Sequence, residues 1–377
     1  MRFETVGPVR PGEFRTALAK VKARLGDSVS LGVVYFPVQM DPLALHGDWR
    51  AVFEAPLVGA STAGAAFTER GSTHTGVVAG VFAETDVSVA IAENLGHTKA
   101  TSLADVINAA AGPGSQKNGV LCLADPFACD GETIVAALRT SLPAHTRAFG
   151  GSAGDDNQFE AVKLLINGQV RDDAAVFAAL TFPSQVGIYV RHGFVRPDDA
   201  REMVVTEADG AQLIGLDGRP AVEVYEEELG RLGMLKSGEG LLQTLANHSL
   251  SMRTPFGEGL LVRTPIGIRS DGSLRLTTAV PVGQQVSVVT TTRARLIAAA
   301  RWLRSQIESF VPNPSGLLVF DCGGRRAMLG QAYDKAIEAF HGTNAVPMLG
   351  IASYGEIAKF GGSAQGFHNA TAVMVGW

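Results

Sequence analysis

The sequence predicts an α/β protein of two domains, with mixed sheets built from repeated strand–loop–helix–strand units plus β-hairpins. Three observations predict this class. Short apolar runs typical of buried strands alternate with segments whose apolar residues recur at helical spacing. The strand–loop–helix–strand unit occurs three times, and each copy ends in a glycine-rich turn. Asn167-Gly168 and Asp271-Gly272 are typical of hairpin turns, so antiparallel strands are expected beside the parallel ones.

The first 28 residues predict an N-terminal helical segment, because apolar residues recur there at helical spacing: Phe14, Leu18, Val21 and Leu25. The first unit then has a strand at 29–36, a helix up to about residue 53, and a strand at 55–58 that enters the turn 59–64. The second unit has a strand at 119–124, a helix after Asp130, and the turn 150–156.

The third unit has a strand at 316–320, a helix through Ile337, and the turn 350–356. A long helix is expected before it, at 293–310, and β-rich stretches separate the units. We place a domain boundary at Phe182-Pro183-Ser184, so that one module spans 29–183 and the other 184–377.

Composition excludes several classes of protein. Apolar residues make up 46% of the 377 residues, which is enough to bury a sizeable core. The 44 glycines follow no G-X-Y period, so the chain is not collagen-like. The net charge of −5 lacks the basic footprint of a nucleic-acid-binding protein, and no nucleic-acid partner is expected.

The cysteines and the N-terminus predict a cytoplasmic protein without a membrane partner. Cys122, Cys129 and Cys322 are odd in number and form no C-x-x-C pair, so neither a disulfide framework nor a zinc site is expected. The first residues lack the apolar region of a signal peptide, and no apolar run approaches the length of a membrane span.

The glycine turns are the first candidate ligand site. Glycine lets main-chain N–H groups approach a ligand, and ligands of α/β sheets bind beyond the carboxyl ends of strands. Asp155, Asp156 and Glu356 follow two of the turns, where a carboxylate can anchor an ammonium or hydroxyl group, whereas Ala65 takes the equivalent position in the first turn. The competing interpretation is that glycine only allows close packing; we expect a site at one or two of the turns.

Ser152 and Cys322 are candidate nucleophiles. Ser152 lies in a G-x-S-x-G sequence, but no helix is expected after it, which disfavours a nucleophile elbow. Cys322 follows a strand near Arg325, whose guanidinium could activate the thiol with His368 as base; a buried structural thiol is the commoner alternative. The eight histidines show no metal-binding spacing, although a single axial histidine for haem needs none.

Several segments resemble the FIST family, the sensory domains of intracellular signal transduction. The N-terminal module is similar over about 28–182, on VGASTAG at 58–64, FGGSAGDD at 149–156, INGQV at 166–170 and AAV at 174–176. The C-terminal module is similar over about 186–377, on LDGRPAV at 216–222, VRTPIG at 262–267, CGGR at 322–325, YGEI at 354–357 and GFHN at 366–369.

The resemblance implies a module that senses a small, amino-acid-like metabolite and signals through a separate protein such as a histidine kinase. We expect the ligand in a cleft formed mainly by the C-terminal module. Arg325 would bind a carboxylate and Glu356 an ammonium, unless these two residues pair with each other to close the fold. The expected ligand-binding residues are Cys322, Arg325, Tyr354, Glu356, His368, Asn369, Asp155, Asp156 and Ser152.

Two alternatives stay open. Some stand-alone members of the family bind haem and report nitric oxide to a histidine kinase, so a haem-based sensor is the first. A Cys-dependent hydrolase is the second, although no convincing catalytic constellation is present and no enzyme activity is expected. Neither a metal site nor an obligatory cofactor is predicted.

Overall fold

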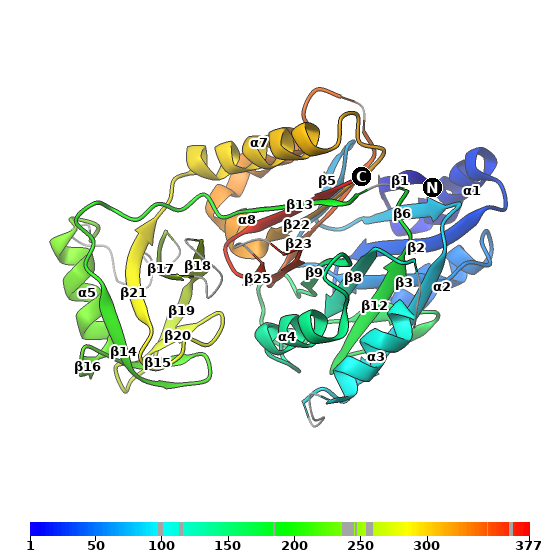
Figure 1. Cartoon of the computed structure of the whole chain (residues 1–377). Helices are drawn as coiled ribbons and strands as arrows, with labels where there is room; N and C mark the ends of the chain where they lie inside the picture. The colour runs from blue at the N-terminus through cyan, green and yellow to red at the C-terminus, as the bar shows by residue number, and fades with distance from the viewer. Residues whose placement is uncertain are drawn as a thin grey trace.

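A computed structural model describes residues 1–96, 101–112, 116–183, 185–235, 245, 247–253, 259–344, 346–361 and 365–377. It confirms the predicted α/β class with several mixed sheets (Figure 1). Three six-stranded sheets form a core, and a fourth, antiparallel sheet lies in a lobe to one side of it. Within the described part of the chain, no helix has the length and apolarity needed to cross a bilayer.

The core consists of three repeats with one order of elements: strand, helix, strand, helix, strand, hairpin, strand. The first repeat contains β1 (Arg2–Val9), α1 (Phe14–Leu25), β2 (Val29–Phe36), α2 (Pro42–Arg50), β3 (Leu57–Ser61), the hairpin β4 (Ala66–Thr68) and β5 (Gly71–Thr73), and β6 (Val77–Ala83). The second contains β7 (Val87–Glu93), α3 (Thr101–Ala111), β8 (Gly119–Ala124), α4 (Gly131–Ser141), β9 (Arg147–Ser152), the hairpin β10 (Leu164–Ile166) and β11 (Gln169–Arg171), and β12 (Ala174–Leu180).

The third repeat differs in two ways: its second helix is split, and a lobe is inserted after its first strand. It contains β13 (Gly187–Arg191), α7 (Arg293–Phe310), β22 (Leu317–Cys322), α8 (Gly323–Leu329), α9 (Tyr333–His341), β23 (Met348–Ser353), the hairpin β24 (Glu356–Lys359) and β25 (Gly366–His368), and β26 (Ala372–Gly376). The predicted unit therefore corresponds to β2–α2–β3, β8–α4–β9 and β22–α8–α9–β23.

The three core sheets have equivalent strand orders: β1-β6-β2-β3-β10-β11, β7-β12-β8-β9-β24-β25 and β13-β26-β22-β23-β4-β5. A parallel pair lies in the middle of each sheet, and the hairpin at its edge comes from another repeat. The hairpin of the first repeat pairs with β23, that of the second with β3, and that of the third with β9. Because this exchange is cyclic, no repeat completes its sheet alone.

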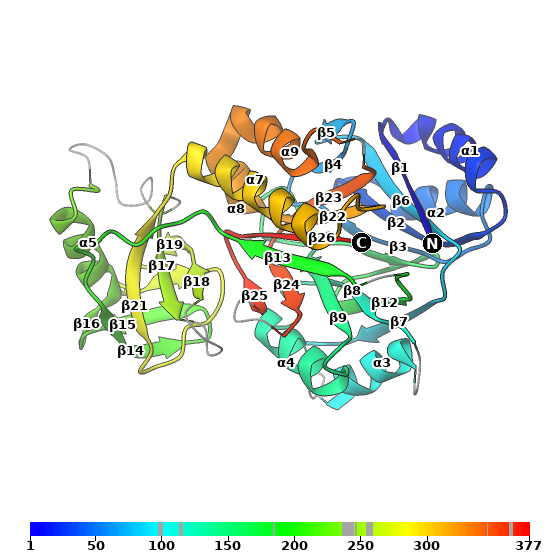
Figure 2. The same cartoon turned by 45° about the horizontal axis from the view of Figure 1, so that its top comes forward.

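Apolar side chains fill the space between the three sheets. One cluster joins their inner faces and includes Phe3, Tyr35, Phe149, Phe320 and Trp377, all of them buried. Helices cover the outer faces: α1 and α2 on the first sheet, α3 and α4 on the second, and α7 and α9 on the third (Figure 2). Each sheet is buried on both faces, which explains why its central strands read as continuous apolar runs.

The lobe has its own apolar core and is inserted between β13 and α7. It contains β14 (Met203–Asp209), β15 (Gln212–Leu216), β16 (Arg219–Pro220), α5 (Ala221–Arg231), β17 (His248–Arg253), β18 (Leu260–Arg263), β19 (Pro265–Ile268), β20 (Leu274–Leu276) and β21 (Gln285–Thr290). Two connections join it to the core (Figure 1). The boundary predicted at 182–184 falls between the second and third repeats, with Ser184 itself outside the described residues.

The N-terminal segment differs from the prediction. Residues 1–28 contain α1 as expected, but they begin with the strand β1, which pairs with β6. A proline such as Pro8 is unfavourable in a central strand, because it cannot donate a ladder hydrogen bond. The structure places Pro8 in β1 at the edge of its sheet, where proline is tolerated.

Close pairing of neighbouring strands leaves no room for a side chain at some glycines. A Cβ atom added to Gly150 in β9 would lie 1.8 Å from the Cys122 carbonyl oxygen of β8. We expect Gly150→Ala to lower the free energy of unfolding by about 1–3 kcal/mol or more, since backbone must move to relieve the clash. Gly47→Ala, on α2 with open space around it, is the control and should raise stability by up to about 1 kcal/mol. Urea denaturation measures both, and equal effects would contradict the packing argument.

Candidate functional site

The three glycine turns meet at one point of the core, here called the turn junction (59–65, 150–156 and 350–356). Main-chain hydrogen bonds connect each turn to the other two. The Gly154 N–H donates to the Ser61 carbonyl at 2.9 Å, and the Tyr354 N–H donates to the Ser152 carbonyl at 3.1 Å. The Ala63 N–H donates to the Ala352 carbonyl at 2.8 Å. Since the turns bond to one another, glycine serves close packing here: a Cβ on Gly154 would lie 2.4 Å from the Ala63 nitrogen.

Arg325 is a buried residue that connects several elements of the third repeat. Its guanidinium is fully buried and donates to the Asp321 carboxylate at 2.5 Å and to the carbonyls of His192 and Leu296 at 3.0 and 3.2 Å. Burial raises the pKa of Asp321, and the charge of Arg325 opposes this shift. Arg325 thus joins α8 to α7 and to the end of β13, instead of pairing with Glu356. All three guanidinium nitrogens have protein partners, so nothing here supports a role in binding a ligand carboxylate.

Glu356 is a buried acid at the start of β24. One oxygen accepts a hydrogen bond from the Ser353 hydroxyl at 2.9 Å, and the other has no hydrogen-bond partner among the described residues. Burial raises the pKa of Glu356 well above its ordinary value, because the charged form is poorly solvated there. Strand pairing confirms Ala65 as its counterpart in the first turn, but in the second turn the counterpart is Leu164 rather than Asp155.

Asp155 and Tyr354 organise the long loop of the second turn. The Asp155 carboxylate accepts main-chain hydrogen bonds from residues 159–161 and one from the Tyr354 hydroxyl. Burial acts to raise the pKa of Asp155, but these hydrogen bonds outweigh it and the net shift is downward. The Tyr354 ring stacks on Phe159, with centroids 4.6 Å apart. Asp156 lies on the surface, 3.7 Å from Arg326.

The remaining predicted residues lie in the interior beside the junction. Cys322 pairs with Ser353 in the parallel ladder, and His368 pairs with Glu356 across β24 and β25. Ser152 ends β9 and a loop follows it, as expected for a turn that is not a nucleophile elbow. Cys322, His368, Asn369 and Ser152 are all buried. The structure therefore brings most of the predicted residues together, but as packed neighbours.

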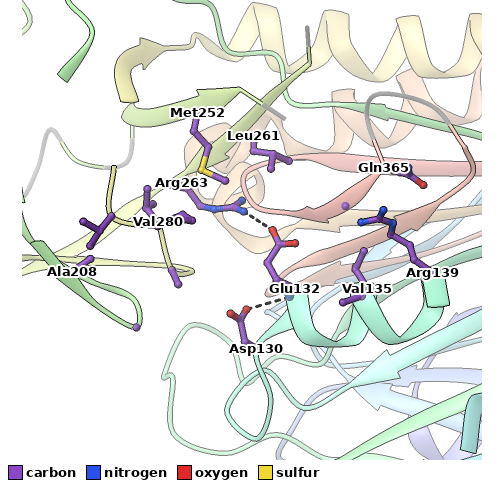
Figure 3. A pocket seen from close by; sticks show the side chains of 16 residues that line it. Asp130, Glu132, Val135, Arg139, Ala208, Met252, Leu261, Arg263, Val280 and Gln365 are labelled. Carbon is purple, nitrogen blue, oxygen red and sulfur yellow. Dashed lines mark hydrogen bonds and ion pairs between the residues drawn. The ribbon is translucent and has the colours of Figure 1, made fainter. Parts of the chain in front are cut away.

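A cavity of about 560 Å³ lies elsewhere, between α4 of the core and the lobe (Figure 3). Its walls come from the first turns of α4, from β14, β17 and β18, from the loop before β21, and from the start of β25. The lining residues are Asp130, Glu132, Val135, Ala136, Arg139, Ala208, Gly210, Met252, Leu261, Arg263, Ala279, Val280, Pro281, Val282, Gln365 and Gly366. Most are apolar, with two side chains of each charge.

An ion pair between Arg263 and Glu132 forms one wall of this cavity (Figure 3). Arg263 is 1% exposed, and its Nη2 donates to the Glu132 carboxylate at 2.7 Å. Its Nη1 reaches the carbonyls of Val262 and Phe367 at 3.2 and 3.4 Å, while Nε has no partner among the described residues. Burial lowers the pKa of Arg263, which Glu132 opposes; burial raises the pKa of Glu132, which Arg263 opposes.

The start of α4 sets the position of Glu132. Asp130 is the N-cap residue and accepts from the Glu132 N–H at 3.2 Å, which begins the helix at Gly131. A Cβ on Gly131 would lie 2.2 Å from the Phe367 ring, so only glycine lets β25 pack this closely. The contact holds the first turn of α4, and with it the Glu132 carboxylate, against the cavity.

Sequence reasoning missed both members of this ion pair. One signal was present: Arg263 ends the apolar run Leu260-Leu261-Val262, where a charge needs a buried partner. The identity of the partner was not accessible, because Glu132 lies 131 residues earlier in the chain and in another repeat.

The cavity does not suit haem. Its described lining contains no histidine, cysteine or tyrosine, and among those described residues Met252 alone has a side chain of a type that serves as an axial ligand. Among the described residues, no three or more His, Cys, Asp or Glu side chains are grouped to hold a metal ion. His97 lies outside the described residues.

The thiols predict a simple labelling pattern. Burial raises the pKa of Cys322, and its sulfur accepts from the Ala370 N–H at 3.2 Å, while Cys122 is also buried and Cys129 is half-buried. We expect iodoacetamide to modify Cys129 alone in the folded protein, and folded Cys129→Ser to resist until urea is added. Mass spectrometry identifies the site. Rapid modification of Cys322 in the folded protein would support the hydrolase alternative instead.

Glu356 predicts a pH dependence of stability. The pKa of this carboxyl group is higher in the folded than in the unfolded protein. The free energy of unfolding therefore falls as the pH rises above the unfolded pKa, which is near 4.5. Each unit of difference costs about 1.4 kcal/mol, so the wild type should lose at least that much between pH 4.5 and 8 relative to Glu356→Gln. Glu338→Gln, on the surface of α9, should keep the wild-type slope. If wild type and Glu356→Gln show the same dependence of urea stability on pH, the pKa of Glu356 is not raised and the argument fails.

Comparison with known protein families identifies the chain. A model of the FIST N domain matches residues 30–219, and a model of the FIST C domain matches residues 221–359. A search of curated proteins found no match. The two family models meet within the lobe, between β16 and α5, and both cross the boundary between core and lobe. The matched regions cover most of the chain, which therefore belongs to the FIST family, whose domains are associated with sensing in signal transduction.

Proposed function

We propose that this protein is a cytoplasmic sensor that binds a small amino-acid-like metabolite in the cavity between core and lobe and signals through a separate protein. One observation carries the proposal: the buried guanidinium of Arg263 lines an apolar cavity, and its Nε has no partner among the described residues. Ligand cavities in proteins have volumes of roughly 300–1,000 Å³, with apolar walls and a few polar groups, and this cavity has that character.

The charges of the lining favour a ligand that carries both signs. Arg263 and Arg139 suit a carboxylate, and Glu132 and Asp130 suit an ammonium group. Between them lie the side chains of Val135, Leu261 and other apolar residues, which suit an aliphatic body. An apolar α-amino acid combines these three features in one small molecule.

The position of the cavity supports a sensing role. Its walls belong to two bodies joined by two connections, so a ligand that touches both favours one arrangement of core and lobe over others. A ligand shifts such an equilibrium only by its difference in affinity between the two arrangements, and a site shared by both bodies provides such a difference. Most of the lining follows residue 184, in keeping with a cleft made mainly by the C-terminal module.

The proposal is tested by a thermal-shift and calorimetric panel of the twenty amino acids. We expect an aliphatic amino acid to raise the melting temperature, since a ligand at 100 times its Kd stabilises the folded state by about 2.7 kcal/mol. Ala136→Trp, which fills the cavity from an exposed position on α4, should abolish the shift, and Ala109→Trp on the surface of α3 should leave it intact. A shift that survives Ala136→Trp, or no binding by any member of the panel, would refute the proposed site.

A further inference from the structure

We infer that the Glu132–Arg263 ion pair is a latch between core and lobe, which a ligand carboxylate opens by taking the place of Glu132 on Arg263. The inference rests on the proposed function, because it concerns the same cavity. It adds the group that every ligand must carry, namely a carboxylate, and the residue that competes with that group for Arg263.

Among ion pairs of described residues, Glu132–Arg263 alone joins the lobe to the core. The others in the lobe stay within it, for example Arg196–Glu202 and Arg201–Glu228. The Arg263 side chain also donates to the Phe367 carbonyl of β25 at 3.4 Å. One guanidinium therefore makes two side-chain contacts from the strands of the lobe to the core.

Glu132 uses only part of the hydrogen-bonding capacity of the Arg263 guanidinium, and a ligand carboxylate can use more of it. A guanidinium binds a carboxylate most strongly through two parallel N–H···O bonds. Glu132 engages only Nη2, at 2.7 Å, and leaves the neighbouring Nε without a partner in the described structure. A ligand carboxylate seated on Nε and Nη2 makes both bonds and satisfies a buried donor that is otherwise unpaired.

The two members of the pair differ in how easily they move. Arg263 is 1% exposed and anchored by main-chain carbonyls, whereas the Glu132 side chain is 40% exposed on the first turn of a helix. Exchange of one carboxylate for another keeps the buried guanidinium paired throughout, which avoids the cost of an uncompensated buried charge. A neutral ligand offers no such exchange.

An amino acid inserts itself into the ion pair. Its carboxylate binds Arg263 on the lobe, and the displaced Glu132 on the core lies next to its ammonium group. A direct contact between core and lobe thereby becomes a longer contact through the ligand. The lobe then changes its position about its two connections, at 192–202 and 291–292, and this movement is the signal.

The latch is tested first without ligand. Spin labels at Arg301→Cys on α7 and Glu226→Cys on α5, in a Cys129→Ser background, report the distance between core and lobe by pulsed electron paramagnetic resonance. We expect Glu132→Gln to broaden and lengthen the distance distribution of the ligand-free protein. Glu202→Gln, which breaks an ion pair within the lobe, is the matched control and should leave it unchanged. An unchanged distribution in Glu132→Gln would overturn the latch.

The exchange is tested with three probes of one shape: L-leucine, 4-methylpentanoate without the amine, and 3-methylbutylamine without the carboxylate. We expect 4-methylpentanoate to bind Glu132→Gln at least threefold more tightly than wild type, because its competitor for Arg263 is gone. Arg263→Lys should weaken L-leucine at least tenfold, and the amine should not bind. Weaker binding of 4-methylpentanoate to Glu132→Gln would overturn the exchange. If Glu132→Gln moves the lobe but no probe binds any variant, the latch stands and the proposed ligand site fails.

Discussion

The fold depends on the hydrogen bonds among the three glycine turns. Each turn must leave its own sheet, pass within main-chain hydrogen-bonding distance of the other two, and deliver a hairpin to a neighbouring sheet. Side chains would obstruct this approach, and the high glycine content of the chain is explained in part by that requirement. The junction also fixes the ends of β9 and β23, and Phe367, which packs against both Gly355 and Gly131, holds the first turn of α4 in place. The wall of the cavity is thus a consequence of how the repeats are joined.

Two of the buried arginines, Arg325 and Arg263, differ in how fully their nitrogens are hydrogen-bonded. Arg325 has an acceptor for each of its nitrogens and lies between α7, α8 and β13, where it holds the core together. Arg263 is as deeply buried, but it lines a cavity, and its Nε has no partner among the described residues. An unpaired donor that also lines a cavity is the observation on which our proposed ligand site rests.

Much of the fold follows from local patterns in the sequence. Apolar periodicity predicted the parallel pairs and the helix α7 at its observed ends, and Asn167-Gly168 and Asp271-Gly272 form the predicted hairpin turns. The exchange of hairpins between repeats was beyond such patterns, because periodicity indicates that a strand exists and not which strand it pairs with. The same limit applies to the site: the turn residues cluster as predicted but are packed in the interior, while Glu132 and Arg263 face each other from distant elements.

The exchange of hairpins has a consequence for how the protein is made. The Met348 N–H bonds to Glu69, 279 residues earlier, and the neighbouring strand β4 pairs with β23. During synthesis, β4 therefore cannot pair with β23 until nearly the whole chain has left the ribosome. Contacts so remote in sequence slow folding and leave an open sheet edge exposed to other nascent chains.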